Sequence, residues 1–325
     1  MNMKIALLGS ALVLSAGAAQ ALELKFANFT PPFHTVNASV IERLGAELSA
    51  ATNGDLTVRG YHGGELGAGP VEQYVRAFQN VAEITWGLPG YTSSQFEQTM
   101  IAELPGALPA DLPGYEALWA AYEDHLAGEF PGTVPLALWT SEPNILIMRS
   151  AEIRSPADLA GLDIRVAGAT AADAAIALGA TPAQMPISQV YQALETGEID
   201  GVITGASTLS DFRLDEVADS FTLGAPLGRN SFFVVMNEGV YNGLSDDHRA
   251  ALDAAIGVPL SRSAEEAWIA AGEAAIATAR ADAANVVIDL TPEEIAVFAD
   301  AVSGVTQAYV DTVGGAATLA AMTAN

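Results

Sequence analysis

The sequence predicts an α/β protein with two lobes, each organised around a mainly parallel β-sheet. The prediction depends on two observations. Short apolar segments with the character of strands alternate with amphipathic helices over residues 22–91, and the same alternation returns over residues 145–211. Successive strands joined by helices are typical of a parallel sheet. The chain of 325 residues is also long enough for about two domains with separate cores.

In the first lobe, strands and helices are expected to alternate from the start of the lobe onward. Val40, Leu44 and Leu48 recur every four residues, as on the buried face of a helix. The expected order is a strand at 22–28, a helix at 36–52, a strand at 56–61, a helix at 70–79 and a strand at 84–87. A helix at 115–126 and a strand at 134–139 follow a proline-rich connection.

The second lobe is expected to contain two helices with clear end signals. Ser155 can cap a short helix that has Pro156 at its first position, and Gly161 can end it. Ser188 is the expected cap of a second helix, which Gly197 ends. The expected order is a helix at 156–161, a strand at 162–167, helices at 171–178 and 189–195, and a strand at 199–204.

Arg165 is the most informative residue of this lobe. Ile164 and Val166 occupy one face of the strand at 162–167, so Arg165 projects from the opposite face. Ligands of open α/β sheets bind at the ends of the strands, and an arginine there can hold a carboxylate through two parallel hydrogen bonds. A solvated arginine at the end of a strand is the alternative interpretation.

The rest of the chain is expected to cross between the lobes more than once. The further elements expected are strands at 145–149, 221–223 and 232–237, a helical region that Ser245 caps and that continues to residue 283, and a last helix at 292–311. The strand at 232–237 is expected to return to the first lobe. The predicted lobes comprise residues 22–142 with 231–270 and residues 143–230 with 271–325. A cleft between two such lobes is the usual place for a small ligand.

The charge balance excludes several classes of partner. The chain has 13 Lys and Arg residues against 39 Asp and Glu residues, which gives a formal net charge of −26. Nucleic acid requires a basic surface, and anionic lipid also attracts basic segments, so neither is expected as a partner. The chain has no cysteine, which excludes disulfides and thiol catalysis.

Residues 1–21 are expected to form a cleavable signal peptide. Lys4 supplies a positive charge, residues 5–17 form the apolar segment, and the tripeptide AQA at 19–21 is a small-residue cleavage site. The apolar segment is shorter than the roughly 20 residues that span a bilayer, so a membrane anchor is disfavoured. The mature protein is expected to begin near Leu22, to be exported and not to insert into the membrane.

The sequence displays no catalytic or metal-binding motif. It lacks the G-x-S-x-G elbow of hydrolases, and its glycine-rich loop at 62–67 does not match the dinucleotide-binding fingerprint. The four histidines are scattered without the spacing of metal ligands. The acid pairs Glu265-Glu266 and Glu293-Glu294 are expected on exposed helix faces. No cofactor or metal is therefore expected, and an enzyme is disfavoured.

Three segments carry a resemblance to a known family. They read PADLAGLDIRV at 156–166, LGATP at 178–182 and MPISQVYQALETGEIDG at 185–201. Together with LKFA at 24–27 and the loop at 64–67, they resemble the periplasmic solute-binding subunits of tripartite ATP-independent periplasmic (TRAP) transporters, of the dicarboxylate-binding (DctP) type. The resemblance covers nearly all of the mature chain.

The resemblance implies a two-lobed periplasmic binding protein fold, type II-like, that closes by hinge bending around an organic acid. It also implies a long C-terminal helix that spans both lobes, which fits the alanine-rich region after Ser245. Arg165 matches the arginine that grips the ligand carboxylate in this family. A periplasmic location and delivery of the ligand to the membrane subunits of a TRAP permease follow from the same resemblance.

The residues around the expected cleft favour a monocarboxylate with an apolar or aromatic body. Some family members carry a second arginine near the crossing between the lobes, where this chain has Pro143 and Asn144, and each further buried carboxylate would need its own partner. The predicted ligand-binding residues are Arg165, Thr204, Trp86, Leu88, Tyr91, Phe29, Ile187, Asn144 and Phe232. For the apolar members of this set, ordinary core packing is the alternative.

Three other functions remain alternatives at the level of the sequence. A C4-dicarboxylate binder of the same transport system would hold the second carboxylate through backbone groups or water. A chemosensory binding protein would lack permease genes beside its own gene. A secreted hydrolase would need a pair of nucleophile and base, which the sequence does not display.

Overall fold

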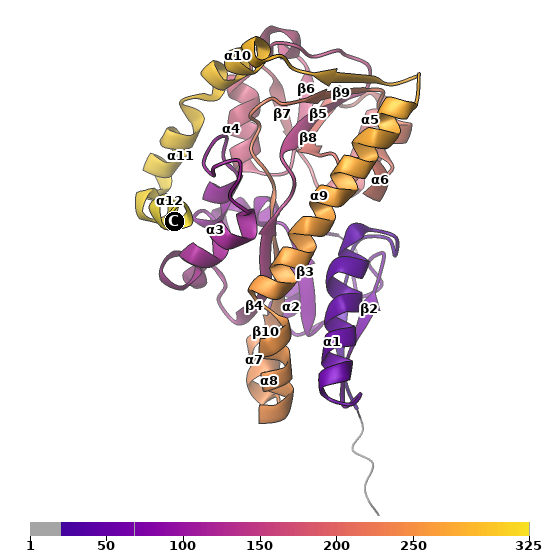
Figure 1. Ribbon diagram of the computed structural model, residues 1–325, viewed down its shortest axis with the longest axis vertical. Helices are drawn as coiled ribbons and strands as arrows, with labels where there is room; N and C mark the ends of the chain where they lie inside the picture. The colour runs from indigo at the N-terminus through magenta and orange to yellow at the C-terminus, as the bar shows by residue number, and fades with distance from the viewer. Residues whose placement is uncertain (1–20, 68, 325) are drawn as a thin grey trace, which may run out of the picture.

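The computed structural model describes residues 21–67 and 69–324, which form two α/β lobes (Figure 1). The predicted signal peptide lies outside these residues except for Ala21. Each lobe is built around one β-sheet, and the predicted two-lobed α/β fold is confirmed. Within the described residues, no helix has both the length and the apolar character needed to cross a membrane.

The sheet of the first lobe has the strand order β2-β1-β3-β10-β4. Its strands are β1 (Leu22–Ala27), β2 (Leu56–Tyr61), β3 (Ile84–Gly87), β4 (Thr133–Thr140) and β10 (Ser231–Asn237). β1 pairs in parallel with β2 and β3, whereas β10 is antiparallel to both β3 and β4. β10 therefore returns from the second lobe, as the sequence predicts. Because it enters from the opposite end, β10 runs against the other four strands of this sheet, which all point the same way.

The sheet of the second lobe has the order β11-β9-β5-β8-β6-β7. Its strands are β5 (Asn144–Met148), β6 (Asp163–Val166), β7 (Thr181–Gln184), β8 (Gly201–Gly205), β9 (Ser220–Leu223) and β11 (Val286–Asp289). β5 is antiparallel to β8 and β9, and the other pairs are parallel. The sequence did not predict the edge strands β7 and β11, which have only four residues each and are partly exposed.

The helices of the first lobe are shorter than the sequence suggested, whereas two α-helices of the second lobe are slightly longer. The α-helices before β9 are α1 (Arg43–Ala51), α2 (Gln73–Phe78), α3 (Gly114–Ala121), α4 (Ala169–Ala177), α5 (Ile187–Thr196) and α6 (Thr208–Asp211). Short segments of π-helix (Asn37–Glu42, Tyr122–Leu126) and 3-10 helix (Pro89–Gln95, Thr99–Glu103, Ala127–Glu129, Pro156–Leu159, Leu214–Glu216) precede, separate and follow them. The expected helix at 36–52 is thus a π-helical turn followed by α1.

The predicted helix ends of the second lobe are confirmed in three of four cases. Ser155 and Asp158 form a capping box at the start of the 3-10 helix at Pro156–Leu159. Gly161 has a left-handed backbone with φ of 79° just after this helix. Gly197 has a left-handed backbone with φ of 75° and ends α5. The cap predicted at Ser188 is wrong, because α5 begins one residue earlier, directly after the extended residue Pro186.

α9 (Val258–Ala281) is the long helix that crosses from the first lobe to the second (Figure 1). Ala264 and Trp268 pack in a hydrophobic cluster of the first lobe, and Ala275 and Ala279 pack in a cluster of the second lobe. The helix is therefore anchored by core packing at both ends, and the predicted helix spanning both lobes is confirmed.

The chain before α9 contains two further helices. α7 (Glu238–Gly243) follows β10, and α8 (Asp246–Ala255) begins after Ser245, whose hydroxyl accepts the N–H of His248. Gly257, with φ of 72°, separates α8 from α9. The predicted alanine-rich region is thus two helices.

The end of the chain forms the helices α10 (Pro292–Val302), α11 (Val305–Val313) and α12 (Ala316–Met322). α12 packs against α3, and Val310 and Met322 join a hydrophobic cluster of the first lobe. The sequence assigned this segment to the second lobe. Phe298 and Val302 of α10 pack in a cluster of the second lobe, whereas α11 contacts both lobes and α12 packs on the first.

Glu265 differs most from its expected environment. The sequence predicted an exposed face of a helix, but the residue is 2% exposed. Its carboxylate accepts the backbone N–H groups of Gly114, Tyr115 and Thr140 at 2.7, 2.9 and 3.0 Å. The prediction is wrong for Glu265 because three backbone donors of the first lobe take the place of water, whereas the neighbouring Glu266 is exposed as expected.

Candidate ligand-binding site

A small cavity, with a volume of about 30 Å³, lies between the two lobes. Residues of both lobes and of α9 line it. The predicted ligand-binding residues in its wall are Phe29, Trp86, Leu88, Tyr91, Arg165, Ile187, Thr204 and Phe232. The structure thus brings together every residue of the predicted set except Asn144.

Asn144 lies behind the wall of the cavity. Its Nδ2 donates to the carbonyl of Leu227 at 3.3 Å, and its Oδ1 accepts from Nδ2 of Asn230 at 3.3 Å. Asn230 lines the cavity, and its Nδ2 also donates to Oγ1 of Thr204 at 3.4 Å. Asn144 therefore positions Asn230, a residue that the sequence reasoning did not select.

Arg165 reaches the cavity because of its position on β6. Ile164 and Val166 pack in a core cluster of the second lobe, and the alternation of side chains along a strand turns Arg165 to the other face. Thr204 lies on the neighbouring strand β8, two residues beyond Val202, which pairs with Arg165. Both side chains lie near the carboxyl ends of parallel strands, where α/β sheets bind ligands.

The guanidinium of Arg165 has no acidic partner among residues 21–67 and 69–324. The residue is 1% exposed, its Nε donates to the carbonyl of Met185 at 2.9 Å, and its Nη2 has no hydrogen-bond partner. No Asp or Glu of these residues forms an ion pair with it. Burial lowers the pKa of Arg165, and the neighbouring Tyr91 opposes part of this change. Such a buried cation requires an anionic partner, and a carboxylate matches its geometry.

Aromatic side chains form much of the remaining wall. Phe29 and Trp86 stack with ring centroids 4.6 Å apart, and Phe232 packs 5.4 Å from Trp268 of α9. Nε1 of Trp86 donates to Oδ1 of Asn28 at 2.8 Å, so its polar atom is satisfied within the protein. These rings also belong to a core cluster of the first lobe. The apolar residues were expected either to bind the ligand or to pack in an ordinary core. These rings do pack in the core with one side, and they line the cavity with the other.

His34 and Asp211 face each other in the cavity wall from different lobes. Oδ1 of Asp211 accepts the backbone N–H and the hydroxyl of Thr35 at 3.0 and 3.1 Å. Nδ1 of His34 accepts the N–H of Val36, so the proton of the neutral ring lies on Nε2, 3.6 Å from Oδ2 of Asp211. Burial lowers the pKa of His34 to about 3 and raises the pKa of Asp211 to about 6. The sequence reasoning missed both residues because only the fold brings them together.

A family model described as bacterial extracellular solute-binding protein, family 7 (DctP), matches residues 26–312. The chain belongs to this family. The match includes Arg165 and the rest of the cavity wall, and it confirms the resemblance to the solute-binding subunits of TRAP transporters that the sequence indicated.

Relatives and solved structures extend the comparison. The C4-dicarboxylate-binding periplasmic protein DctP of Rhodobacter capsulatus is 32% identical over 129 residues, which are 39% of this chain and 38% of that protein. A TRAP periplasmic solute-binding protein of Bordetella bronchiseptica with bound (R)-mandelate and (S)-mandelate is 28% identical, with a TM-score of 0.83 over 93% of this chain and 97% of the other. A TRAP solute-binding protein from Rhodoferax ferrireducens T118 in complex with copurified benzoate is 25% identical, with a TM-score of 0.86 over 93% and 96%.

The two lobes of this solute-binding protein touch each other beside the cavity. Oη of Tyr91 in the first lobe accepts the N–H of Ile187 in the second lobe at 3.1 Å. Oγ of Ser93 accepts the N–H of Ala169 at 3.3 Å. With the bonds between Thr35 and the Asp211 carboxylate, these contacts close the cleft and explain why Arg165 is buried.

Gly90 and Gly168 allow the closest backbone approach between the lobes. A Cβ atom on Gly168 would lie 2.6 Å from Cα and 2.9 Å from the carbonyl oxygen of Gly90. Both distances are well below van der Waals contact. Any side chain at position 168 would therefore hold the lobes apart.

Glu142 lies in the connection between β4 and β5, where the chain crosses from the first lobe to the second. Its Oε1 accepts the backbone N–H of Ser207, which lines the cavity, at 2.6 Å. Burial raises the pKa of Glu142 to about 7. This carboxyl group therefore titrates near neutral pH at a crossing between the two lobes.

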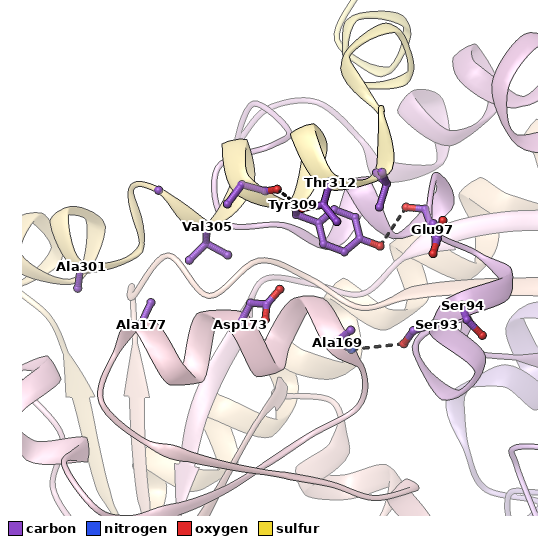
Figure 2. A pocket seen from close by; sticks show the side chains of 13 residues that line it. Ser93, Ser94, Glu97, Ala169, Asp173, Ala177, Ala301, Val305, Tyr309 and Thr312 are labelled. Atoms are coloured by element: carbon purple, nitrogen blue, oxygen red, sulfur yellow. Dashed lines mark hydrogen bonds between the residues drawn. The ribbon is translucent and has the colours of Figure 1, made fainter.

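A wider surface groove lies between α4 and the C-terminal helices (Figure 2). Figure 2 shows Asp173 of α4 and Tyr309 of α11 in its walls, and the Tyr309 hydroxyl donates to the carbonyl of Glu97 at 3.1 Å. None of its lining residues is basic. Because Asp173 and Glu97 would repel an anion, the groove does not suit a carboxylate. In the part of the chain that the structure describes, no group of three His, Cys, Asp or Glu residues could hold a metal ion.

Proposed function

We propose that this protein is the periplasmic solute-binding subunit of a TRAP transporter, and that it captures a monocarboxylate with an aromatic or apolar body for delivery to the membrane permease. One observation carries the proposal. A guanidinium that is 1% exposed and has no acidic partner in the described residues lies in the wall of a cavity otherwise rich in aromatic rings. A ligand carboxylate supplies the missing anion.

The charges in the cavity favour one ligand carboxylate over two. Besides Arg165, the titratable groups of its wall are the acid Asp211, the neutral His34 and the phenol Tyr91. A second carboxylate would have no second cation and would approach the Asp211 carboxylate. A buried charge without a partner costs several kcal/mol. The aromatic wall instead suits a ring, and two of the solved relatives hold benzoate and mandelate.

The site also supports binding without catalysis. A hydrolase would need a base beside a nucleophile, and His34 is the histidine of the cavity wall. Its Nδ1 is occupied by the N–H of Val36, and its Nε2–H faces Asp211. No nitrogen of the ring is free to accept a proton from Ser207, and a pKa of about 3 makes the ring a weak base. A chemosensory protein remains the second candidate, and permease genes beside its own gene would exclude it.

A thermal-shift panel tests the proposed ligand class. It should contain benzoate, mandelate and branched 2-oxo acids, the C4 dicarboxylates succinate and malate, and the uncharged ester methyl benzoate as the matched control. A ligand present at 100 times its dissociation constant adds about 2.7 kcal/mol to the free energy of unfolding. We expect clear shifts with the aromatic acids and none with methyl benzoate. Large shifts with succinate or malate alone would instead favour a C4-dicarboxylate binder.

A further inference from the structure

The two carboxylate oxygens of Asp211 have different environments. Oδ1 accepts two hydrogen bonds from Thr35 of the other lobe, at 3.0 and 3.1 Å. Oδ2 is buried and has no hydrogen-bond partner. Its neighbour Nε2 of His34 lies 3.6 Å away, which is beyond the length of a hydrogen bond. Asp211 is 5% exposed and lies in the cavity wall.

An unpaired buried acceptor of this kind requires a donor, because desolvation without a hydrogen bond is costly. Several donors of the cavity wall are already engaged. Nε1 of Trp86 donates to Asn28, and the hydroxyl of Thr208 donates to the carbonyl of Gly205. Nδ2 of Asn230 is directed to its own neighbours Asn144 and Thr204. The ring N–H of His34 faces Oδ2 but lies beyond hydrogen-bond length, so Oδ2 is open to a donor from a molecule in the cavity.

The geometry points to a ligand that carries a hydrogen-bond donor, a hydroxyl or a protonated amine, on the body opposite its carboxylate, with Oδ2 of Asp211 as the acceptor. The inference rests on the proposed function for the carboxylate end, which Arg165 holds. Arg165 and Asp211 form no ion pair with each other, so each is free to bind a separate group of one molecule. Asp211 is then a specificity-determining residue.

The ionisation of Asp211 is consistent with this role. Burial raises the pKa of its carboxyl group to about 6, so at pH 7.5 the group is mainly the carboxylate, which only accepts hydrogen bonds. A site built to bind a donor discriminates strongly against analogues that lack the donor, because the buried acceptor is then left unpaired. A methoxy group at the same position has no proton to donate, so a methoxybenzoate should bind no more tightly than benzoate.

Titration calorimetry at pH 7.5 with a series of substituted benzoates tests the inference. The series contains benzoate, its 2-, 3- and 4-hydroxy derivatives, the corresponding methoxy derivatives, and 3- and 4-(aminomethyl)benzoate. For the wild type we expect that at least one hydroxyl or aminomethyl compound binds about 10- to 100-fold more tightly than benzoate, whereas the methoxy compound of the same position does not. The hydroxyl and amine arms distinguish the two kinds of donor.

The variant Asp211→Asn changes the acceptor into a donor while keeping an oxygen for the bonds from Thr35. The measured quantity is the ratio of the benzoate and hydroxybenzoate dissociation constants, whatever the absolute affinity. This ratio should fall to near 1 in Asp211→Asn and stay at its wild-type value in Asp215→Asn, the same change at an exposed position outside the cavity wall.

Three outcomes would overturn the inference. If benzoate binds but no donor-bearing derivative binds better, the wild-type series alone rejects the role of Asp211 while the proposed function stands. If the gain persists in Asp211→Asn, another group is the acceptor. If no carboxylate of the series binds, the inference fails for benzoates, and the branched 2-oxo acids of the thermal-shift panel decide whether the proposed function fails as well. Since the wild-type series is decisive by itself, the inference stays testable if the variant does not fold.

Discussion

Replacing Arg165 by methionine should abolish tight ligand binding and, in the same protein, allow the lobes to close without ligand. In the closed arrangement the guanidinium is 1% exposed, and its Nη2 has no hydrogen-bond partner. Closing the empty protein therefore buries an unpaired positive charge. A ligand carboxylate removes this penalty, so Arg165 couples binding to closure. Methionine has a long apolar side chain and carries no charge to desolvate.

The size of both effects follows from the surroundings of Arg165. Moving the guanidinium out of water costs several kcal/mol, and its hydrogen bond to the carbonyl of Met185 returns about 1.5–3 kcal/mol. Closure of the empty protein is then unfavourable by a few kcal/mol, which corresponds to roughly 0.1–10% closed molecules. Loss of the pairing between arginine and carboxylate should weaken binding by about 2–5 kcal/mol, or roughly 30-fold to several thousand-fold.

Two measurements test this prediction together. Titration calorimetry gives the loss of affinity, and small-angle scattering of the ligand-free proteins should show Arg165→Met more compact than the wild type. Arg165→Lys should also bind weakly, since a single ammonium does not reproduce the two parallel hydrogen bonds, but it should stay open because it keeps the charge. Arg149→Met, at an exposed position of the second lobe, is the control and should change neither quantity. The reasoning is refuted if Arg165→Met binds benzoate within a few-fold of the wild type, or if its ligand-free scattering curve equals that of the wild type.

Two further predictions concern closure and pH. Gly168→Ala places a Cβ atom 2.6 Å from Cα of Gly90 and should weaken binding roughly 5- to 150-fold through the 1–3 kcal/mol of overpacking. Gly128→Ala, where a Cβ meets open space, should bind as the wild type in calorimetry. Equal affinities of the two variants would mean that the lobes need not meet at Gly168. Burial raises the pKa of Glu142 from 4.5 to about 7. Between pH 4.5 and pH 7 the folded protein therefore binds more protons than the unfolded chain. The free energy of unfolding falls as the pH rises through this range. Glu142→Gln should remove this contribution. Between pH 4.5 and pH 8, the free energy of unfolding in urea of the variant should therefore rise by up to about 3 kcal/mol relative to that of the wild type. A difference between variant and wild type that does not change with pH would contradict the raised pKa of Glu142.

The sequence was sufficient to place Arg165 because the signal is local. Ile164 and Val166 mark the core face of one short strand, and the alternation along that strand determines the direction of the residue between them. Part of the aromatic wall could also be predicted, since Trp86 lies on a strand that the apolar pattern identifies and Tyr91 follows that strand. In both cases, the residues next to a side chain in the sequence are enough to predict where that side chain lies.

The remaining parts of the site depend on contacts that no local pattern encodes. Asp211 and His34 meet only because α6 of one lobe closes onto the loop after β1 of the other. Trp268 lies on an alanine-rich helix, where its direction depends on how α9 packs against the first lobe. Glu265 on the same helix was expected in water, but backbone N–H groups distant in sequence surround it. A polar residue whose partners are backbone groups of another element looks, in the sequence, like any solvated side chain.

The most direct test of the central claim is a crystal structure of the protein in complex with benzoate. The account predicts that the benzoate carboxylate lies about 2.7–2.9 Å from the Arg165 guanidinium, with its ring against Trp86 and Phe232 and the lobes closed around it. Benzoate in the groove between α4 and α11, or a carboxylate held by groups other than Arg165 in the cavity, would contradict the account.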